Sequence, residues 1–409
     1  MFKKTQLPIL GILFAISVYT QNRLAVFGVI LIGSIILVIE LWQKYAFKKL
    51  TIKRSLGKKQ IFYGEETEYI LEVENKKLLP ILWLQIDDHI TKGVTFLGNE
   101  LLSKRIGSRI NVFSDIFNMR WYEKVTRKYK VKPMKRGYYR FGKGEVQAND
   151  LFGVDNVVRE TTDLTSLIVY PRVLPIDKLG LPAGNPFGRN SVNRWIYKDP
   201  SNKVGVRSYR KGDRLNQINW QATAKHQNLQ SYEIKPAMDE KLYIFLDARL
   251  NEYHWEGMIL EKFEVAVVCA ASIVEYAIKK NCEVGLMSNG LIYEKVPYIK
   301  VEPGKGLLHR KRLLKSLAMV EPFYPKELSK MIGKQVAEMT PGSKTVIITC
   351  LITESLVQSV KLLKKRNFEP TVIKIGSIDD KWKDMLAGVR VYSVSEERLW
   401  DEIEEVRFS

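Results

Sequence analysis

The sequence predicts a multidomain protein with an N-terminal transmembrane helical hairpin, a β-rich sandwich-like module and a doubly wound α/β domain. Two apolar runs open the chain, an alternating apolar and polar pattern continues to about residue 172, and short branched apolar runs alternate with helical stretches after residue 240. With 409 residues the chain is long enough to bury two or three separate cores. We therefore expect four segments: a hairpin at 1–45, a β-rich module at 46–176, a linker with an unusual cluster at 177–239, and the α/β domain at 240–409.

The expected hairpin consists of the apolar runs 7–19 and 24–42, which Gln21, Asn22 and Arg23 separate. The second run has one acidic residue, Glu40, and at about 1.5 Å per residue it can cross a hydrocarbon core of about 30 Å. The first run is shorter and could belong to a signal peptide. Because no convincing small-x-small cleavage site precedes Gln21, a hairpin is the favoured interpretation.

Basic residues predict the orientation of this hairpin in the cell membrane. Lys3 and Lys4 precede it, Lys44, Lys48 and Lys49 follow it, and only Arg23 lies in the turn. Since cytoplasmic flanks carry the excess of Lys and Arg, we expect a multi-pass protein with two spans and with both termini in the cytoplasm. We also expect an anionic membrane surface to contact the basic residues that follow: Lys53, Arg54, Lys58 and Lys59.

The soluble part shows two different periods. Thr67, Tyr69, Leu71 and Val73 alternate with glutamates, and the series Leu82, Leu84 and Ile86 repeats the pattern, as in an antiparallel sandwich. After residue 240, apolar runs at 242–246, 284–287, 345–349 and 371–375 suit strands that are covered on both faces. Two helical faces lie between these runs, one formed by Phe263, Val267, Ala270, Val274 and Ala277 and the other by Leu356, Val360 and Leu363.

The net charge bears on which anionic partners the chain could bind, and the cysteine spacing bears on whether it could hold a metal. The net charge of +20 suits nucleic acid or an anionic membrane, but acidic residues interleave with basic ones along the whole chain. We therefore expect no specific nucleic acid partner. Cys269, Cys282 and Cys350 lack the spacing of a metal site and are expected to be reduced and buried.

The segment 204–225 holds the densest collection of unusual residues. Gly212 permits a turn, Asp213 can cap the helix that follows, and Leu215, Ile218 and Ala222 would face a core. Trp220 is a large anchor whose indole N–H requires an acceptor. Arg207 and Arg210 could pair with Asp213, with another carboxylate, or with an anionic ligand or partner, so the cluster is either a structural lock or an interaction site.

This segment resembles the domain of unknown function 58 family, whose signature is Arg-x-Tyr-x-x-Gly-Asp followed by Ile-x-Trp and small residues. The matching residues are Arg207, Tyr209, Gly212, Asp213, Ile218, Trp220 and Ala224. Further similarities lie at 135–142, at 150–153, at 170–172 and at Glu233.

The resemblance implies a von Willebrand A-like fold for the C-terminal domain. Family members are often encoded beside MoxR-type AAA+ ATPases and transglutaminase-like membrane proteins, and no catalytic activity is established for them. The resemblance therefore implies a non-enzymatic, cytoplasm-facing adaptor or assembly protein in a bacterial cell membrane. Its expected partner is a MoxR-type AAA+ ATPase or envelope machinery, and a transglutaminase-like membrane protein is a further candidate. The alternative is a binder or enzyme that acts on an anionic small molecule through Arg207, Asp213 and Trp220.

A magnesium site is the cofactor that such a fold can carry, in an Asp-x-Ser-x-Ser loop after the first strand. Here the loop reads Asp247-Ala-Arg-Leu-Asn251, so Arg249 stands where a hydroxyl should coordinate the ion. We expect no cofactor and no catalytic residues; Asp247 is a weak metal candidate that is expected to pair with Arg249 or another basic group.

Overall fold

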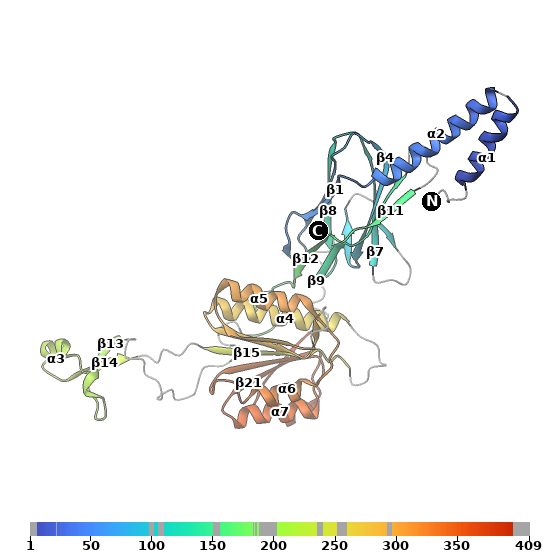
Figure 1. Ribbon diagram of the computed structural model, residues 1–409. Helices are drawn as coiled ribbons and strands as arrows, with labels where there is room; N and C mark the ends of the chain where they lie inside the picture. The colour runs from blue at the N-terminus through green and yellow to red at the C-terminus, as the bar shows by residue number, and fades with distance from the viewer. Residues whose placement is uncertain are drawn as a thin grey trace. The chain divides into compact units, whose positions relative to one another are not determined.

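The computed structural model divides the chain into two compact units, Met1–Tyr170 and Pro171–Ser409 (Figure 1). The structure describes residues 6–21, 23–97, 102–104, 110–149, 156–182, 184, 186–187, 203–234, 240–251, 260–292 and 297–395. Lys3, Lys4 and the family landmark at 150–153 lie outside these residues.

Two helices open the first unit, α1 (Gln6–Tyr19) and α2 (Arg23–Tyr45). Among the described helices, α2 has the length and apolar composition to cross a membrane. With 14 residues, α1 extends only about 21 Å at 1.5 Å per residue, which is short of a hydrocarbon core of about 30 Å. The expectation of two spans is therefore not supported, and neither is the placement of both termini in the cytoplasm that was based on it. Within the residues that the structure describes, one candidate membrane helix lies near the N-terminus.

The end of α2 is part of the core of the β-module. Trp42 and Ala46 are buried in one apolar cluster with residues of the sheets, among them Leu71 and Phe117. Lys77 closes the end of the helix, because its Nζ donates to Tyr45 O, the last carbonyl of α2, at 2.7 Å and to Ala46 O. Helix and module are thus joined by side-chain packing as well as by the chain.

The β-module contains two sheets in its described part. The smaller has the order β1-β3-β8-β5, with all neighbours antiparallel. Its strands are β1 (Leu50–Leu56), β3 (Thr67–Asn75), β5 (Val94–Phe96) and β8 (Lys124–Pro133). The larger has the order β11-β10-β4-β9-β12-β2, with β7 also on β4 and β6 on β7. Its strands are β2 (Gln60–Phe62), β4 (Ile81–Thr91), β6 (Leu102–Lys104), β7 (Ile110–Met119), β9 (Gly137–Gly142), β10 (Glu145–Asn149), β11 (Asn156–Glu160) and β12 (Leu164–Tyr170).

Two buried carboxylates tie strands of the module together. Asp88 in β4 pairs with Arg54 in β1 at 2.7 Å and accepts a hydrogen bond from the Tyr69 hydroxyl in β3. Burial, together with the Asp88 charge, raises the pKa of Tyr69 well above its ordinary value, so the phenol stays protonated. Asp115 in β7 has the same kinds of partner, Arg127 and Tyr129.

Two expectations for this module are corrected by the structure. Arg54 was expected at lipid headgroups, but its side chain is buried against Asp88. In β4 the buried residues are Ile81, Leu84, Ile86, Asp88 and Ile90, while Leu82 is exposed. A register shift in the pairing of β4 with β7 between Ile81 and Leu84 explains the change, because a bulge reverses the faces on one side of it. The alternation in β3 is confirmed.

The second unit is built on a sheet with the order β18-β16-β15-β20-β21-β22, in which only β18 is antiparallel to its neighbour. Its strands are β15 (Lys241–Leu246), β16 (Glu283–Ser288), β18 (Ile299–Gly304), β20 (Lys344–Thr349), β21 (Glu369–Ile375) and β22 (Arg390–Val394). A short pair consists of β17 (Leu291–Ile292) and β19 (Val320–Glu321). The four strands expected from the apolar runs after residue 240 are all present.

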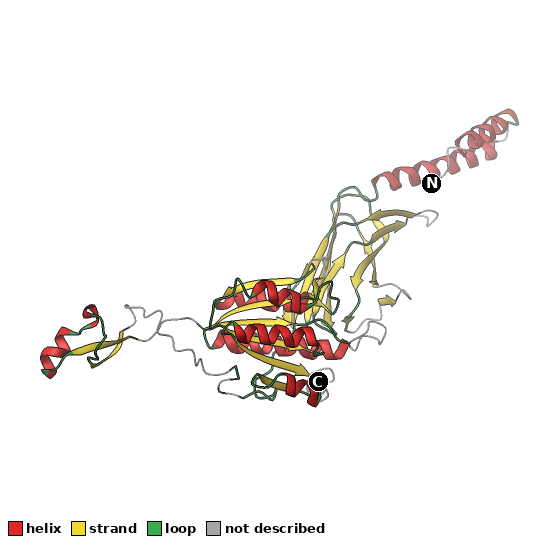
Figure 2. Ribbon diagram, turned by 90° about the horizontal axis from the view of Figure 1, so that it is seen from below, coloured by secondary structure: helices red, strands yellow, loops and turns green. Residues whose placement is uncertain are grey.

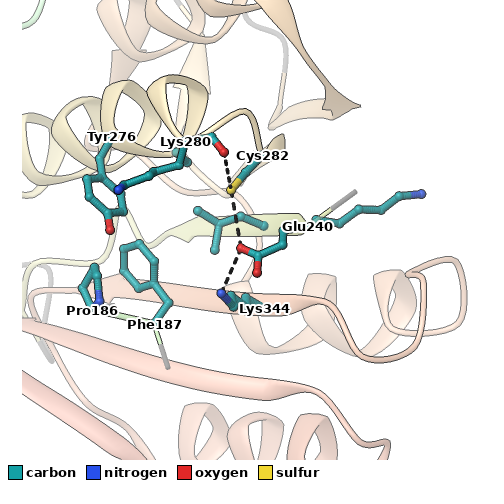
Figure 3. Close-up of a pocket in the computed structure, with 10 residues that line it drawn as sticks. Pro186, Phe187, Glu240, Tyr276, Lys280, Cys282 and Lys344 are labelled. Atoms are coloured by element: carbon teal, nitrogen blue, oxygen red, sulfur yellow. Dashed lines mark hydrogen bonds and ion pairs between the residues drawn. The ribbon is translucent and has the colours of Figure 1, made fainter. Parts of the chain in front are cut away.

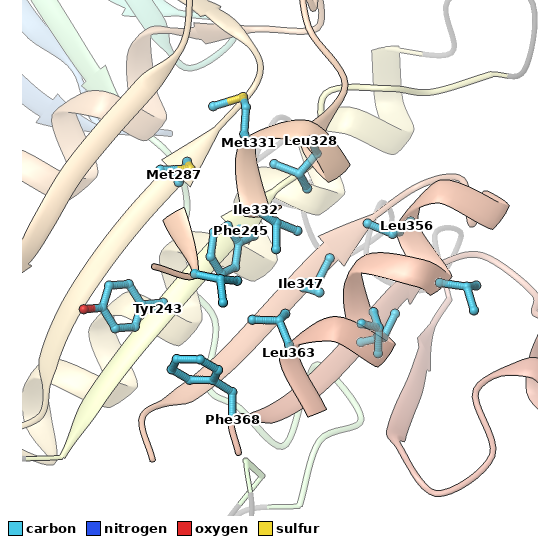
Figure 4. Packing of buried hydrophobic residues seen from close by; sticks show 14 of the residues in the cluster. Tyr243, Phe245, Met287, Leu328, Met331, Ile332, Ile347, Leu356, Leu363 and Phe368 are labelled. Atoms are coloured by element: carbon cyan, nitrogen blue, oxygen red, sulfur yellow. The ribbon is translucent and has the colours of Figure 1, made fainter. Parts of the chain in front are cut away.

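Helices cover both faces of this sheet, α4 and α5 on one side and α6 and α7 on the other (Figures 1 and 2). The helices are α4 (Leu260–Lys279), α5 (Gly306–Met319), α6 (Leu328–Gln335), α7 (Glu354–Lys365) and α8 (Asp380–Met385). Phe245, Ile332, Ile347 and Leu363 meet in the core beneath α6 and α7 (Figure 4). Both predicted helix faces are buried, which confirms them.

We predict that Trp42→Ala destabilises the β-module, although Trp42 belongs to the candidate membrane helix. Loss of a buried Trp side chain should lower the free energy of unfolding by about 3–5 kcal/mol. Hydrogen exchange of the β3 and β4 amides in the detergent-solubilised chain measures this change. The neighbouring exposed residue supplies the control, since Leu41→Ala should change it by no more than about 0.5 kcal/mol. Equal effects of the two substitutions would contradict the packing of α2 into the module.

Candidate functional site

The predicted cluster lies in a small element formed by residues 203–234, which we call the signature module. Strands β13 (Lys203–Ser208) and β14 (Gln230–Ile234) pair antiparallel, and between them lie the 3-10 turn Leu215–Gln217 and α3 (Trp220–His226). Gly212 has a φ of 109°, as the turn after β13 requires. Asn219 begins α3 by accepting a hydrogen bond from Ala222 N at 3.0 Å.

A two-point ion pair closes the turn of the signature module. Arg207 Nη1 lies 2.8 Å from Asp213 Oδ2, and Arg207 Nη2 lies 2.7 Å from Asp213 Oδ1. Asp213 Oδ2 also accepts from the backbone N–H of Arg210 at 3.0 Å. The hydrogen bonds to Asp213 raise the pKa of the Arg207 guanidinium above its ordinary value. Of the partners considered for Arg207, the structure thus selects the carboxylate six residues along the chain.

The remaining signature residues have different surroundings. Tyr209 continues the hairpin, because its backbone N–H donates to Leu229 O at 2.9 Å, and Ile218 is buried beside β14. The Arg210 side chain is exposed. Asp213 does not cap α3 as expected; Asn219, which directly precedes the helix, takes that role.

The large apolar residues of the signature module are exposed. Trp220 is 66% exposed and Leu215 75%, where a buried anchor and a core residue were expected. Val206 and Leu229 are exposed as well. Among residues 205–233, only Ile218 and Ser231 are buried. An element of this size with one buried apolar side chain has little core of its own, so its local order depends on the ion pair and the hairpin.

Asp247 lies at the carboxyl end of β15, where strands β15, β16 and β20 end together. Its Oδ1 accepts from Asn289 Nδ2 at 3.0 Å and from the backbone N–H of Arg249 at 3.1 Å. Its Oδ2 accepts from the Thr349 hydroxyl at 3.2 Å. Burial raises the pKa of Asp247 above that of a free aspartate, and these hydrogen bonds oppose the rise. The contact expected with Arg249 therefore involves its backbone amide.

These surroundings do not fit a magnesium ion. Magnesium requires oxygen ligands in an octahedral shell, whereas both oxygens of Asp247 face N–H or O–H donors. Within the described ranges, no three His, Cys, Asp or Glu side chains are placed to hold a metal. We derive no metal chemistry from Asp247.

A pocket of about 290 Å³ opens at the other end of the strands (Figure 3). Lys344 Nζ pairs with Glu240 Oε2 at 3.1 Å inside it, and Cys282 Sγ lies 3.7 Å from the same oxygen. Phe187, which precedes the signature module in the chain, and Glu240, which follows it, both line this pocket. Cys282 is half-buried and the other two cysteines are buried, and none of these three residues forms a disulfide.

A family model matches most of the second unit, and one relative matches a longer part of the chain. The family model described as "Protein of unknown function DUF58" matches residues 205–397. The match begins within the signature module and continues through the α/β domain. "Uncharacterized protein YeaD" of Bacillus subtilis (strain 168) is 21% identical over 321 residues, which cover 78% of this chain and 74% of that protein.

Solved structures resemble parts of the chain weakly. The CARDB domain of the PF1109 protein from Pyrococcus furiosus is 14% identical and covers 29% of this chain and 91% of its own, with a TM-score of 0.19. Proximal thread matrix protein 1 from the mussel byssus is 12% identical and covers 41% of this chain and 46% of its own, with a TM-score of 0.30. Scores this low carry no argument about fold or function.

We predict that Arg207 and Asp213 stabilise the signature module as a pair. A double-mutant cycle with Arg207→Met and Asp213→Asn should give a coupling of up to about 1 kcal/mol, because the pair is two-pointed but partly solvated. Hydrogen exchange of the Tyr209 amide, which is bonded within the hairpin, reports the local opening. The exposed pair Asp380 and Lys383 serves as the control and should give a smaller coupling at its own helix. An uncoupled Arg207 and Asp213 would contradict a stabilising pair.

We further predict that Asp247→Asn leaves the α/β domain at least as stable at neutral pH. The new amide oxygen can accept from Arg249 N and Asn289, and its NH₂ can donate to Thr349 Oγ1, whose own hydrogen can go to Leu351 O at 2.7 Å. Asp247→Ala leaves these donors unsatisfied and should cost about 1–3 kcal/mol. The measurement is hydrogen exchange of the β15 amides.

The raised pKa of Asp247 also predicts how the stability of wild type relative to Asp247→Asn depends on pH. Between the ordinary pKa of 3.8 and its raised value, the folded chain keeps the Asp247 proton and the unfolded chain releases it. Wild type should therefore gain stability relative to Asp247→Asn as the pH falls through the raised pKa. If wild type instead gained stability relative to Asp247→Asn as the pH rises, the fold would stabilise the charged form of the Asp247 carboxylate.

Proposed function

We propose that this chain is a membrane-attached, non-enzymatic adaptor that binds a protein partner through the signature module. The observation that supports it best is the exposure of Trp220 and Leu215 beside an ion-paired turn. Aromatic and apolar side chains on a locally rigid support are the usual centre of a protein interface.

The alternative function, binding of an anionic small molecule by Arg207, has less support. Asp213 occupies both ends of the guanidinium, so a ligand would have to displace a two-point ion pair. Trp220 is exposed, and so cannot enclose a ligand in the way that small-molecule pockets do. A partner that contacts Trp220 and Leu215 requires no such displacement.

Attachment through α2 is supported by the packing of its last turns. Cleavage of α2 as a signal sequence would remove Trp42 from the core of the β-module, and cleavage after Tyr45 would also leave Lys77 without one of its carbonyl acceptors. An uncleaved helix that serves as an anchor keeps both. The exposed Lys44 in the last turn of the helix, with Lys48 and Lys49 directly after it, favours the cytoplasmic side for the β-module.

We propose a MoxR-type AAA+ ATPase as the partner, within envelope machinery that can include a transglutaminase-like membrane protein. The support is the family resemblance of the signature residues. For the α/β domain we propose a von Willebrand A-like fold, supported by its parallel central strands with helices on both faces. In this proposal the domain presents the signature module to the ATPase.

We predict that Leu215→Ser with Trp220→Ala abolishes co-purification of a MoxR-type ATPase with the detergent-solubilised chain, tagged at its C-terminus. The two side chains are exposed, so the variant should fold, and hydrogen exchange at Tyr209 verifies that the module is intact. A second variant, Arg207→Ala with Asp213→Ala, should lose the partner by loosening the turn.

The matched control replaces another exposed Leu and Trp. Leu78 is 72% exposed and Trp121 64%, both in the β-module, so Leu78→Ser with Trp121→Ala removes similar apolar surface elsewhere. This variant should retain the ATPase. Wild type that purifies without a MoxR-type ATPase, or equal loss from both variants, would contradict the proposed partner site.

A further inference from the structure

Helix α5 presents an exposed face that combines apolar and basic side chains. Leu307 is 71% exposed and Leu308 84%, in the first turn of the helix. Lys311, Arg312 and Lys315 are exposed in the next two turns. Residues 308, 311, 312 and 315 are spaced as one helical face, so the leucines and the cations share one side. We call these five residues the α5 face.

The opposite side of α5 explains why this face points outward. Leu313, Leu314, Leu317 and Ala318 are buried. Arg310 turns inward as well and lies 2.5 Å from Glu275 of α4, and the His309 ring lies 2.7 Å from Val284 O. The helix is therefore fixed on the domain, and the α5 face contributes nothing to that packing.

The charge around the α5 face is positive. The α5 sequence contains no acidic residue. Glu275 on α4 pairs with Arg310 and with Lys279, and Glu302 on β18 pairs with Lys300 at 2.9 Å. An anionic surface would meet three exposed cations here with no acidic side chain from the helix itself.

We propose that the α5 face docks on an anionic phospholipid surface. Adjacent exposed leucines with lysine and arginine on the same side match an interfacial contact, in which apolar side chains enter the acyl boundary and cations meet phosphates. A nucleic acid backbone would use the cations but gain nothing from Leu307 and Leu308. This inference rests on the proposed attachment through α2, because a tether raises the effective concentration of the bilayer at a weak contact.

The basic residues should set the strength of this contact. Each Lys or Arg near an anionic bilayer contributes about a fivefold factor in the ratio of docked to undocked domain. Lys311→Glu with Lys315→Glu removes two cations, which corresponds to about a 25-fold loss before any added repulsion. Because both side chains are exposed, folding should be unaffected.

The experiment uses the full chain in vesicles of phosphatidylcholine, with or without phosphatidylglycerol, that carry a nitroxide-labelled lipid. A fluorophore is placed at Leu308→Cys, in a Cys282→Ser background because the other two cysteines are buried. We expect lipid quenching at position 308 that requires phosphatidylglycerol and falls with Lys311→Glu and Lys315→Glu. The comparison site is Gln358→Cys, exposed on α7 across the sheet.

The matched charge control is Lys361→Glu with Lys365→Glu, which reverses an exposed lysine pair of the same spacing on α7. It should leave the quenching at position 308 unchanged. Equal quenching at positions 308 and 358, or quenching that ignores phosphatidylglycerol, would overturn the α5 proposal while the chain stays with the vesicles. A chain that carbonate extracts from the vesicles contradicts attachment through α2 instead, and removes the basis of this inference too. Loss of the ATPase partner is tested separately and affects neither result.

Discussion

The packing of Trp42 and Ala46 into the β-module is the contact on which the organisation of the first unit depends. An apolar helix followed by a domain is ordinarily a tether, whose two parts fold and move separately. Here the last turns of α2 share a core with β3, β4 and β7, and Lys77 closes the helix end. A bilayer that holds α2 would therefore hold the β-module in one orientation, close to its surface.

Buried aspartates have different hydrogen-bond partners in the two units. In the β-module, Asp88 and Asp115 lie in the larger sheet and each contacts an Arg and a Tyr of the smaller sheet, so charged pairs link the two sheets. In the α/β domain, Asp247 is surrounded by neutral donors at the ends of three strands. Removing one member of a buried charged pair lowers the free energy of unfolding more than removing a neutral hydrogen-bond partner. We therefore expect substitution of Asp88 or Asp115 to destabilise the protein more than substitution of Asp247.

Much of the α/β domain could be predicted from the sequence, because strands with two buried faces and helices with one buried face leave periodic patterns. The failures occurred where a long-range partner decides. In the sequence Arg54 belongs to a run of basic residues and was expected at the membrane surface. Its ion pair with Asp88, 34 residues away, is visible only in the fold. Leu82 lies outside the period because of a bulge that no local pattern marks.

The ion pair of the candidate site could be predicted from the sequence, but the exposure of the residues around it could not. The pairing of Arg207 with Asp213 spans six residues and was among the alternatives that the sequence offered. The exposure of Trp220 could not be inferred, because a large aromatic residue serves equally in a core and at an interface. The 14 residues of α1 are too few to cross a bilayer. The basic residues on both sides of the two apolar runs nevertheless favoured two spans with cytoplasmic ends.

The position of Phe187 and Glu240 on one pocket has an evolutionary consequence. The chain departs toward the signature module and returns from it at the same place on the α/β domain, before the first strand of the sheet. Such an insertion can be lengthened, shortened or exchanged without rerouting any strand. Related chains could therefore alter the signature module while the domain that carries it stays the same.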